Sequence, residues 1–212
     1  MAEGIDRAAP FTTAAPLDCL RSNGITFIGR YYSNSDWKNL TRSEAQLISS
    51  RGLWIVTVYQ DAANTPGYFT YERGVSDCSR AIQRATDVGQ PTGTPIYFAV
   101  DFEVRAQDSR LANVERYFEG VQQRMRQYAQ DNGGASWPLG IYGTYDAVTY
   151  IRDRVDDVTY IWLTYAWSRG RTLDEANLYQ YSNDLTLDAC RNAGTVDRVR
   201  SNGSGGGFKV NA

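Results

Sequence analysis

The hydrophobic positions of the chain follow two spacings, which alternate from the first residues to the last. Short segments carry apolar residues at every second position or continuously, as strands do, and longer segments carry them at the spacing of helices. The predicted strands cover residues 4–8, 25–32, 53–59, 96–103, 139–143, 160–167, 177–182 and 195–199. The predicted helices cover residues 14–22, 41–51, 72–88, 108–130 and 146–152.

The order of these elements predicts a barrel. Strands separated by helices form parallel β-α-β units. Eight such strands predict an α/β fold, a compact (β/α)8 TIM-like barrel with short or missing last helices. A doubly wound open sheet is the main alternative, but that fold normally has a glycine-rich phosphate loop after the first strand. Residues 6–10, Asp-Arg-Ala-Ala-Pro, contain no glycine.

The length of 212 residues fits one large domain. We assign residues 1–200 to the barrel domain and residues 201–212, which are rich in Gly and Ser, to a tail or linker. Side chains on a strand alternate between its two faces. This alternation places Ile5, Val100 and Val196 on the faces that meet the helices, so we expect them to be buried.

Composition narrows the chemistry. The chain contains no histidine, which excludes Ser-His-Asp and Cys-His catalysis and metal sites built on imidazole. The net charge of −2 provides no basic face for nucleic acid, and no apolar run is long enough for a membrane helix. The first residues lack the pattern of a signal peptide. We therefore expect a protein that is secreted or delivered without a signal peptide visible in this chain.

The three cysteines are Cys19, Cys78 and Cys190. They are far apart and odd in number, and no Cys-x-x-Cys spacing is present, which argues against a zinc or redox site. We favour three small, partly buried side chains. One disulfide remains an alternative if the protein is exported.

The predicted strand 96–103 carries the most informative pattern. Its alternation puts Tyr97, Ala99, Asp101 and Glu103 on the face that points into the barrel. Active sites of such barrels are built at the carboxyl ends of the strands. Two neighbouring carboxylates in a poorly solvated place are expected to raise the pKa of one member, as a general acid requires. The alternative is that arginines such as Arg30 or Arg105 pair with them.

Two further acids are expected beside this pair. Asp6 ends the first predicted strand and Asp197 ends the eighth, and these two strands are neighbours in a closed barrel. A ring of four acids without histidine suits a glycosidase or a cation-binding centre. Aromatic residues gather at the same strand ends and can stack on sugar rings, although many can equally be core residues. They are Tyr31, Tyr32, Tyr59, Tyr142, Tyr145, Trp162, Tyr165, Trp167, Tyr179 and Tyr181.

Three motifs resemble a known family. They are Gly4-Ile5-Asp6, the segment Tyr97-Phe98-Ala99-Val100-Asp101-Phe102-Glu103, and Leu178-Tyr179-Gln180-Tyr181-Ser182. They are similar to motifs of the family 25 glycoside hydrolases, the Chalaropsis-type lysozymes, and more closely to related bacterial glycoside-hydrolase-like domains, formerly called domain of unknown function 1906. Gly29-Arg30-Tyr31-Tyr32, Thr41-x-x-Glu44-x-x-x-Ile48 and Phe69-Thr70-Tyr71-Glu72-x-Gly74 also fit that group. The resemblance covers residues 4–199.

The resemblance implies a lysozyme-like or muramidase-like hydrolase that acts on peptidoglycan or a related amino-sugar glycan. Glu103 resembles the general acid, Asp101 the carboxylate that stabilises the positive intermediate, and Asp6 a supporting acid. The substrate-binding residues are then expected to be Asp197, Tyr32, Tyr59, Tyr142, Trp162, Tyr165 and Gln180. No cofactor or metal is expected, and we expect a monomer. The alternatives are a non-catalytic glycan-binding module and a targeting component of a phage or secretion assembly.

Overall fold

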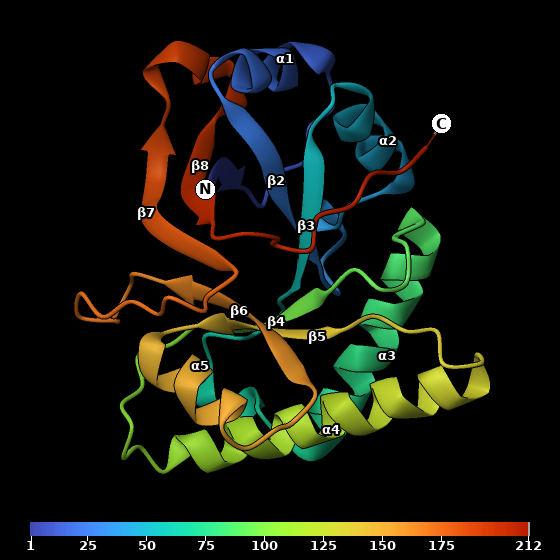
Figure 1. Ribbon diagram of the computed structural model, residues 1–212, viewed down its shortest axis with the longest axis vertical. Helices are drawn as coiled ribbons and strands as arrows, with labels where there is room; N and C mark the ends of the chain where they lie inside the picture. Colours follow the sequence, from blue (N-terminus) through green and yellow to red (C-terminus); the bar gives the residue numbers. More distant parts are fainter. Residues whose placement is uncertain (212) are drawn as a thin grey trace.

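Eight strands close into a barrel in the computed structural model, which describes residues 1–211 (Figure 1). The strands are β1 (Ala2–Asp6), β2 (Ile25–Tyr32), β3 (Trp54–Tyr59), β4 (Ile96–Val100), β5 (Leu139–Gly143), β6 (Val158–Thr164), β7 (Leu178–Thr186) and β8 (Thr195–Ser201). The α-helices are α1 (Ala14–Ser22), α2 (Arg42–Ser50), α3 (Tyr71–Val88), α4 (Arg110–Asp131) and α5 (Tyr145–Arg152), with short 3₁₀ helices η1 (Asp36–Lys38), η2 (Pro66–Tyr68) and η3 (Asp188–Ala193). The predicted α/β barrel is confirmed.

The last strand runs in an unexpected direction. Strands β1 to β7 are parallel to their neighbours, whereas β8 is antiparallel to both β1 and β7. A parallel crossover needs about a dozen residues or more, and only residues 187–194 connect β7 to β8. The expectation that Asp197 ends its strand is therefore wrong. Asp197 lies near the start of β8 and still pairs with Asp6 on β1.

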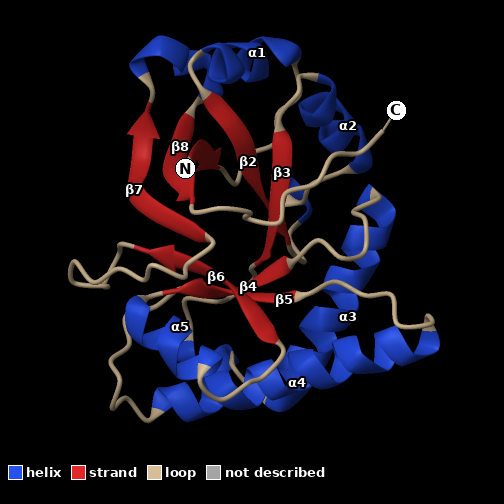
Figure 2. Cartoon of the chain, in the orientation of Figure 1, coloured by secondary structure: helices blue, strands red, loops and turns tan. Residues whose placement is uncertain are grey.

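The helices cover two sides of the barrel (Figure 2). Helices α1 and α2 lie on one side and α3, α4 and α5 on the other, while β7 and β8 carry only η3. Helices α3 and α4 cross closely because each has a glycine at the contact. A Cβ on Gly74 would lie 2.0 Å from the Tyr117 carbonyl oxygen, and one on Gly120 would lie 2.1 Å from that of Tyr71. None of the helices in residues 1–211 has both the length and the apolarity needed to cross a membrane.

The barrel wall separates two buried layers. Ile5, Val100 and Val196 are buried, as expected for residues that face the helices. Residues 202–211, expected as a tail or linker, lie along the end of the barrel where β1 begins. There Phe208 is buried and pairs with Ile55 of β3, and Tyr97 donates a hydrogen bond to the Gly205 carbonyl oxygen.

Two of the three cysteines are bonded. Cys19 of α1 forms a disulfide with Cys190 of η3, at a sequence separation of 171 residues, and Cys78 is free and buried. The favoured interpretation of three unpaired cysteines is wrong for Cys19 and Cys190, and the alternative of one disulfide is confirmed. The disulfide ties the first helix to the connection that leads into β8.

Candidate active site

A polar cluster fills the barrel where β1, β2 and β6 end and where β7 and β8 begin. At its centre is Asp6, which is 2% exposed. The Tyr31 hydroxyl donates to Asp6 Oδ1 at 2.7 Å, and Gln180 Nε2 donates to Asp6 Oδ2 at 2.8 Å. Gly29 provides the space, because a Cβ there would lie 2.6 Å from the Cβ of Asp6. Asp6 is therefore a carboxylate in a fixed position.

Gln180 connects this acid to the rest of the cluster. Its Nε2 also donates to Asp197 Oδ2 at 3.0 Å. Its Oε1 accepts hydrogen bonds from the hydroxyls of Tyr142, at 2.9 Å, and Thr164, at 2.7 Å. Because both ends of the amide have partners, Gln180 holds Asp6 and Asp197 on one donor group.

Burial controls the electrostatics of the cluster. It raises the pKa of Asp6 from 3.8 to about 7, and the nearby charge of Asp197 adds to this rise. The hydrogen bonds from Tyr31 and Gln180 oppose it. Burial likewise raises the pKa of Asp197 and of Asp101. Carboxyl groups that take up a proton near neutral pH are typical of sites for acid–base chemistry.

Asp101 lies at the edge of the cluster. Strand β4 ends at Val100, before the predicted end at residue 103, because the backbone N–H of Asp101 bonds to the Ala63 carbonyl oxygen instead of to a neighbouring strand. Gln60 Nε2 donates to Asp101 Oδ2 at 3.0 Å. The charges of Asp101 and Asp197 both act on Asp6, so three acids share this end of the barrel.

Glu103 lies in a different environment, on the loop that follows β4. Its side chain is 52% exposed, and its Oε1 accepts a hydrogen bond from Arg169 Nη2 at 3.0 Å. The expected extension of the strand face to Glu103 is wrong, since the strand has already ended. The arginine is also not one of those considered from the sequence. Arg30 pairs with Glu44 inside the protein, and Arg105 forms no ion pair with residues 1–211.

The candidate aromatic residues lie in three places. Tyr142 and Trp162 lie inside the barrel and meet edge to face, with ring centroids 5.5 Å apart. Tyr165 lies just beyond β6 and is exposed. Tyr32 and Tyr59 are buried behind the barrel wall, where they donate hydrogen bonds to Gln90 and to Asp61 and Asp77. Tyr32, Tyr59 and Trp162 are at most 1% exposed, so none of the three has the surface expected of a residue that binds a ligand.

The sequence did not identify Gln60 and Lys38, and it gave Tyr31 no role of its own. Tyr31 precedes the buried Tyr32, so alternation would have pointed it into the barrel. Gln60 likewise continues the inward face of β3 beyond Val58. Lys38 lies over the ring of Tyr31, at 5.4 Å from its centroid, and its charge acts on Asp101. Nothing in the local sequence marks Lys38, because η1 brings it there.

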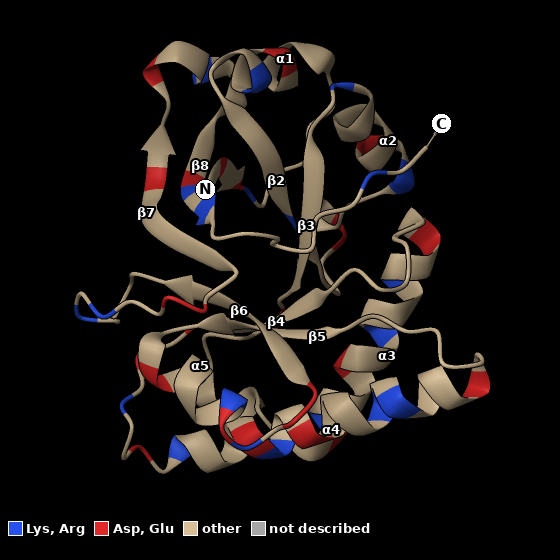
Figure 3. Cartoon of the chain, in the orientation of Figure 1, with Lys and Arg blue, Asp and Glu red and all other residues tan. Residues whose placement is uncertain are grey.

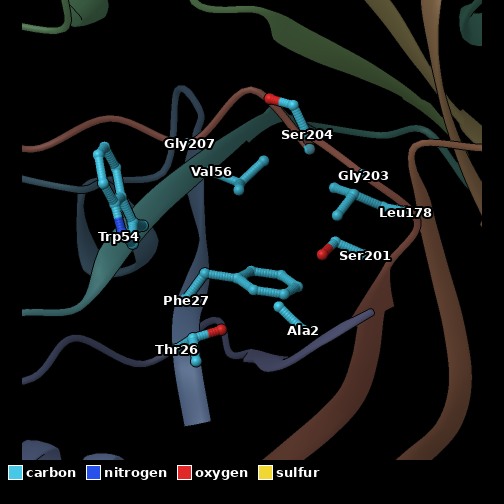
Figure 4. A pocket seen from close by; sticks show the side chains of 11 residues that line it. Ala2, Thr26, Phe27, Trp54, Val56, Leu178, Ser201, Gly203, Ser204 and Gly207 are labelled. Carbon is cyan, nitrogen blue, oxygen red and sulfur yellow. The ribbon is translucent and has the colours of Figure 1, made fainter.

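A hollow of about 280 Å³ lies at the opposite end of the barrel (Figure 4). Phe27, Val56 and Leu178 contribute apolar side chains, and Trp54 stands at one side. No carboxylate lines this hollow, so it lacks the acid–base groups found at the other end. Residues 1–211 contain no group of three or more acidic or cysteine side chains arranged to hold a metal ion.

Solved structures share this fold. The secreted protein Rv2525c of Mycobacterium tuberculosis, crystallised in complex with L-tartrate, superposes with a TM-score of 0.71 at 21% identity, over 97% of this chain and 98% of Rv2525c. A family 25 glycosyl hydrolase of Bacillus anthracis superposes with a TM-score of 0.60 at 15% identity, over 96% and 90% of the two chains. The barrel is thus the fold of a glycoside hydrolase family.

Sequence comparison identifies the family. FadG of Bacillus subtilis strain 168 is 28% identical over 143 residues, which are 66% of this chain and 24% of FadG. The chain therefore matches only about a quarter of that relative. The model of the Rv2525c-like, glycoside hydrolase-like domain matches residues 18–204. With most of the barrel inside that match, the chain belongs to the Rv2525c-like family of glycoside hydrolase-like domains.

Proposed function

We propose that the protein is a muramidase-like glycoside hydrolase that cleaves the glycan of the bacterial cell wall. The observation that carries this proposal is the cluster of Asp6, Asp101 and Asp197 at one end of the barrel, where burial raises the pKa of all three. Glycosidases need one carboxyl group that holds a proton near neutral pH and one that is ionised.

The roles follow the motif resemblance. Glu103, once released from Arg169, takes up a proton from solvent and transfers it to the glycosidic oxygen as the bond between that oxygen and the anomeric carbon breaks. Asp101, which Gln60 orients, stabilises the positive charge on the sugar, or orients the acetamido group of the substrate. Asp6 is the supporting acid, held by Tyr31 and Gln180, and it adds negative potential to the site only when it is ionised, above a pH of about 7.

A glycan-binding module without catalysis is the second candidate. The observation in its favour is the ion pair between Glu103 and Arg169, because an acid held by an arginine is not free to donate a proton. In this case the exposed Tyr165 and Trp167 bind the glycan and no bond is cleaved.

The disulfide bears on the place of action. Disulfides persist in oxidising compartments and are rare in the cytosol. We infer from Cys19–Cys190 that the protein acts outside the cytoplasm, where the cell-wall glycan lies.

Digestion of purified peptidoglycan tests the proposal. Mass spectrometry of the soluble products should find new N-acetylmuramic acid reducing ends, and a zymogram should show a cleared band. Protein that sediments with peptidoglycan but releases no new ends would support the binding module and refute the hydrolase.

A further inference from the structure

The loop between β6 and β7 reaches across the end of β5 to Glu103, the candidate general acid. It leaves the body of the molecule and carries charged residues (Figure 3). Arg169 on this loop contacts Glu103 on the loop after β4, and β5 lies between β4 and β6 in the barrel. The ion pair therefore crosses the rim of the barrel from β6 to β4. Its acid, Glu103, lies two residues after Asp101 in the chain.

The loop is built to hold its exposed residues in place. Ser168 is fully buried, donates to the Thr164 carbonyl oxygen and accepts from the Tyr145 backbone N–H. Arg171 pairs with the carboxylate of Asp146, which lies in the first turn of α5. These contacts fix the loop from inside.

The residues on either side of Ser168 have a strained backbone. Trp167 has a φ of 54° and Arg169 a φ of 55°, in the left-handed region that side chains other than glycine rarely adopt. Such strain persists only where the surroundings enforce it, and it is frequent at ligand sites. Both side chains are more than 40% exposed. The strained backbone thus carries two exposed side chains, an indole and a guanidinium, that are two residues apart on the same loop.

Arg169 has unused binding capacity. A guanidinium has five N–H donors and can bind a carboxylate with two of them. Within residues 1–211, the side chain of Arg169 makes one hydrogen bond, to Glu103. A ligand that presents a carboxylate can therefore compete for Arg169, and the exposed indole of Trp167 on the same loop suits the apolar face of a sugar.

We propose that Arg169 and Trp167 form a subsite for a carboxylate carried by the glycan, and that this carboxylate displaces Glu103 from Arg169. The proposal rests on the proposed function and extends it, since binding of an acidic amino sugar would free the general acid. A neutral amino sugar would leave the ion pair intact. The carboxylate can belong to the lactyl group of N-acetylmuramic acid or to a stem peptide.

Binding of a matched pair of disaccharides tests this subsite. N-acetylglucosaminyl-N-acetylmuramic acid and N,N′-diacetylchitobiose differ only by the lactyl group. Neither contains the bond from N-acetylmuramic acid to N-acetylglucosamine that a muramidase cleaves. Titration calorimetry should give about tenfold tighter binding of the acidic disaccharide, as expected for hydrogen bonds between charged groups. Arg169→Gln should bind both equally. Arg116→Gln, which removes an exposed, ion-paired arginine of α4, should keep the preference.

Glu103→Gln provides the sharper arm. It removes the competitor for Arg169, so affinity for the acidic disaccharide should rise several-fold while that for N,N′-diacetylchitobiose stays constant. A third ligand, the same disaccharide with its stem peptide, identifies the source of the carboxylate. In this ligand the lactyl carboxyl is bonded to the peptide as an amide. A preference for it over N,N′-diacetylchitobiose that Arg169→Gln removes therefore assigns the carboxylate to the peptide.

Two results would overturn the subsite: equal affinity of the wild type for all three ligands, or a preference that survives Arg169→Gln in a protein with wild-type melting. No bond is broken in this experiment. An Arg169-dependent preference without cleavage of peptidoglycan would refute the hydrolase and support the subsite. Cleavage of peptidoglycan without such a preference would support the hydrolase and refute the subsite.

Discussion

Asp6 and Glu103 are carboxylates at the same end of one barrel, and their surroundings differ in every respect. Asp6 is buried and receives hydrogen bonds from a tyrosine and a glutamine. Glu103 is half exposed on a loop and is bonded to an arginine that is itself exposed. Neutral donors hold Asp6, whose charge depends on pH because burial raises its pKa to about 7, whereas a cation balances the charge of Glu103.

The difference separates two tasks. A fixed, buried acid can set the electrostatic potential of a site, but it has no freedom to follow a reacting atom. An acid on a loop can move, and its partner can be exchanged for another anion. The inner acids therefore form the framework of the site, and Glu103 with Arg169 forms its adjustable part.

The largest effect is expected from a new buried acid that has no hydrogen-bond donors around it. Val100 lies one residue before Asp101, and it is fully buried on the helix side of β4. Val100→Asp places a charge there without the partners that Asp6 has, and should abolish soluble expression. Val100→Ala should remain folded and lose about 2 kcal/mol in denaturant titrations. A soluble Val100→Asp protein with a cooperative transition would show that donors are not what makes Asp6 tolerable.

The next effect concerns the outer acid and activity. Glu103→Gln keeps the shape of the side chain and removes its proton, so peptidoglycan release should fall about 10²–10⁴-fold. The melting temperature should hardly change, because Glu103 is exposed. Glu119→Gln, which removes another exposed and ion-paired glutamate on α4, serves as control. Equal activity of Glu103→Gln and the wild type would exclude Glu103 as the general acid.

The inner acid should make stability depend on pH. The pKa of Asp6 is about 7 in the folded protein, against 3.8 for an ordinary aspartate, so ionising Asp6 costs the folded state more than the unfolded state. The free energy of unfolding should then fall as pH rises from about 4 to about 7, by up to about 4 kcal/mol. Asp6→Asn should make this slope shallower. An unchanged slope in urea titrations across this range would locate the effect in other groups.

The smallest effect concerns one donor. The Tyr31 hydroxyl donates to Asp6 Oδ1 and thereby lowers the pKa of Asp6. Tyr31→Phe removes this hydroxyl. The pH midpoint of the stability curve should therefore move upward, and stability above it should fall by about 1–3 kcal/mol. Tyr128→Phe, on α4, should change neither. A downward shift of the midpoint in Tyr31→Phe would mean that the hydroxyl bonds the protonated acid.

The sequence predicted the strands because apolar spacing reports burial directly. β2 and β5 have the predicted bounds, and most other strands differ by one to three residues at an end. Strand direction is not encoded in that spacing, and β8 was therefore assigned the wrong direction. The short connection of residues 187–194 was the available signal, since it is too short for a parallel crossover.

The site was predictable to the extent that it lies on strands. Asp6 and Gln180 are found where strand motifs placed them, and Asp197 meets Asp6 although its strand is reversed. Glu103 differs because alternation ends with β4, and a loop follows tertiary contacts instead of a period. The partner of Glu103 lies 66 residues away, and no local pattern links Arg169 to it.

The disulfide has a mechanical consequence. Because β1 and β8 are antiparallel neighbours, tension on the two chain ends would unzip their ladder one pair at a time, from Ala2–Ser201 toward Asp6–Asp197. The load would then reach Cys19–Cys190, and the covalent bond would carry it past the chain between the two cysteines, whose sequence separation is 171. A stretched molecule would lose its central acid pair while β2 to β7 stay shielded from the force. Release of the tension would let two short strands return to an intact wall, so pulling would act as a reversible switch on the site.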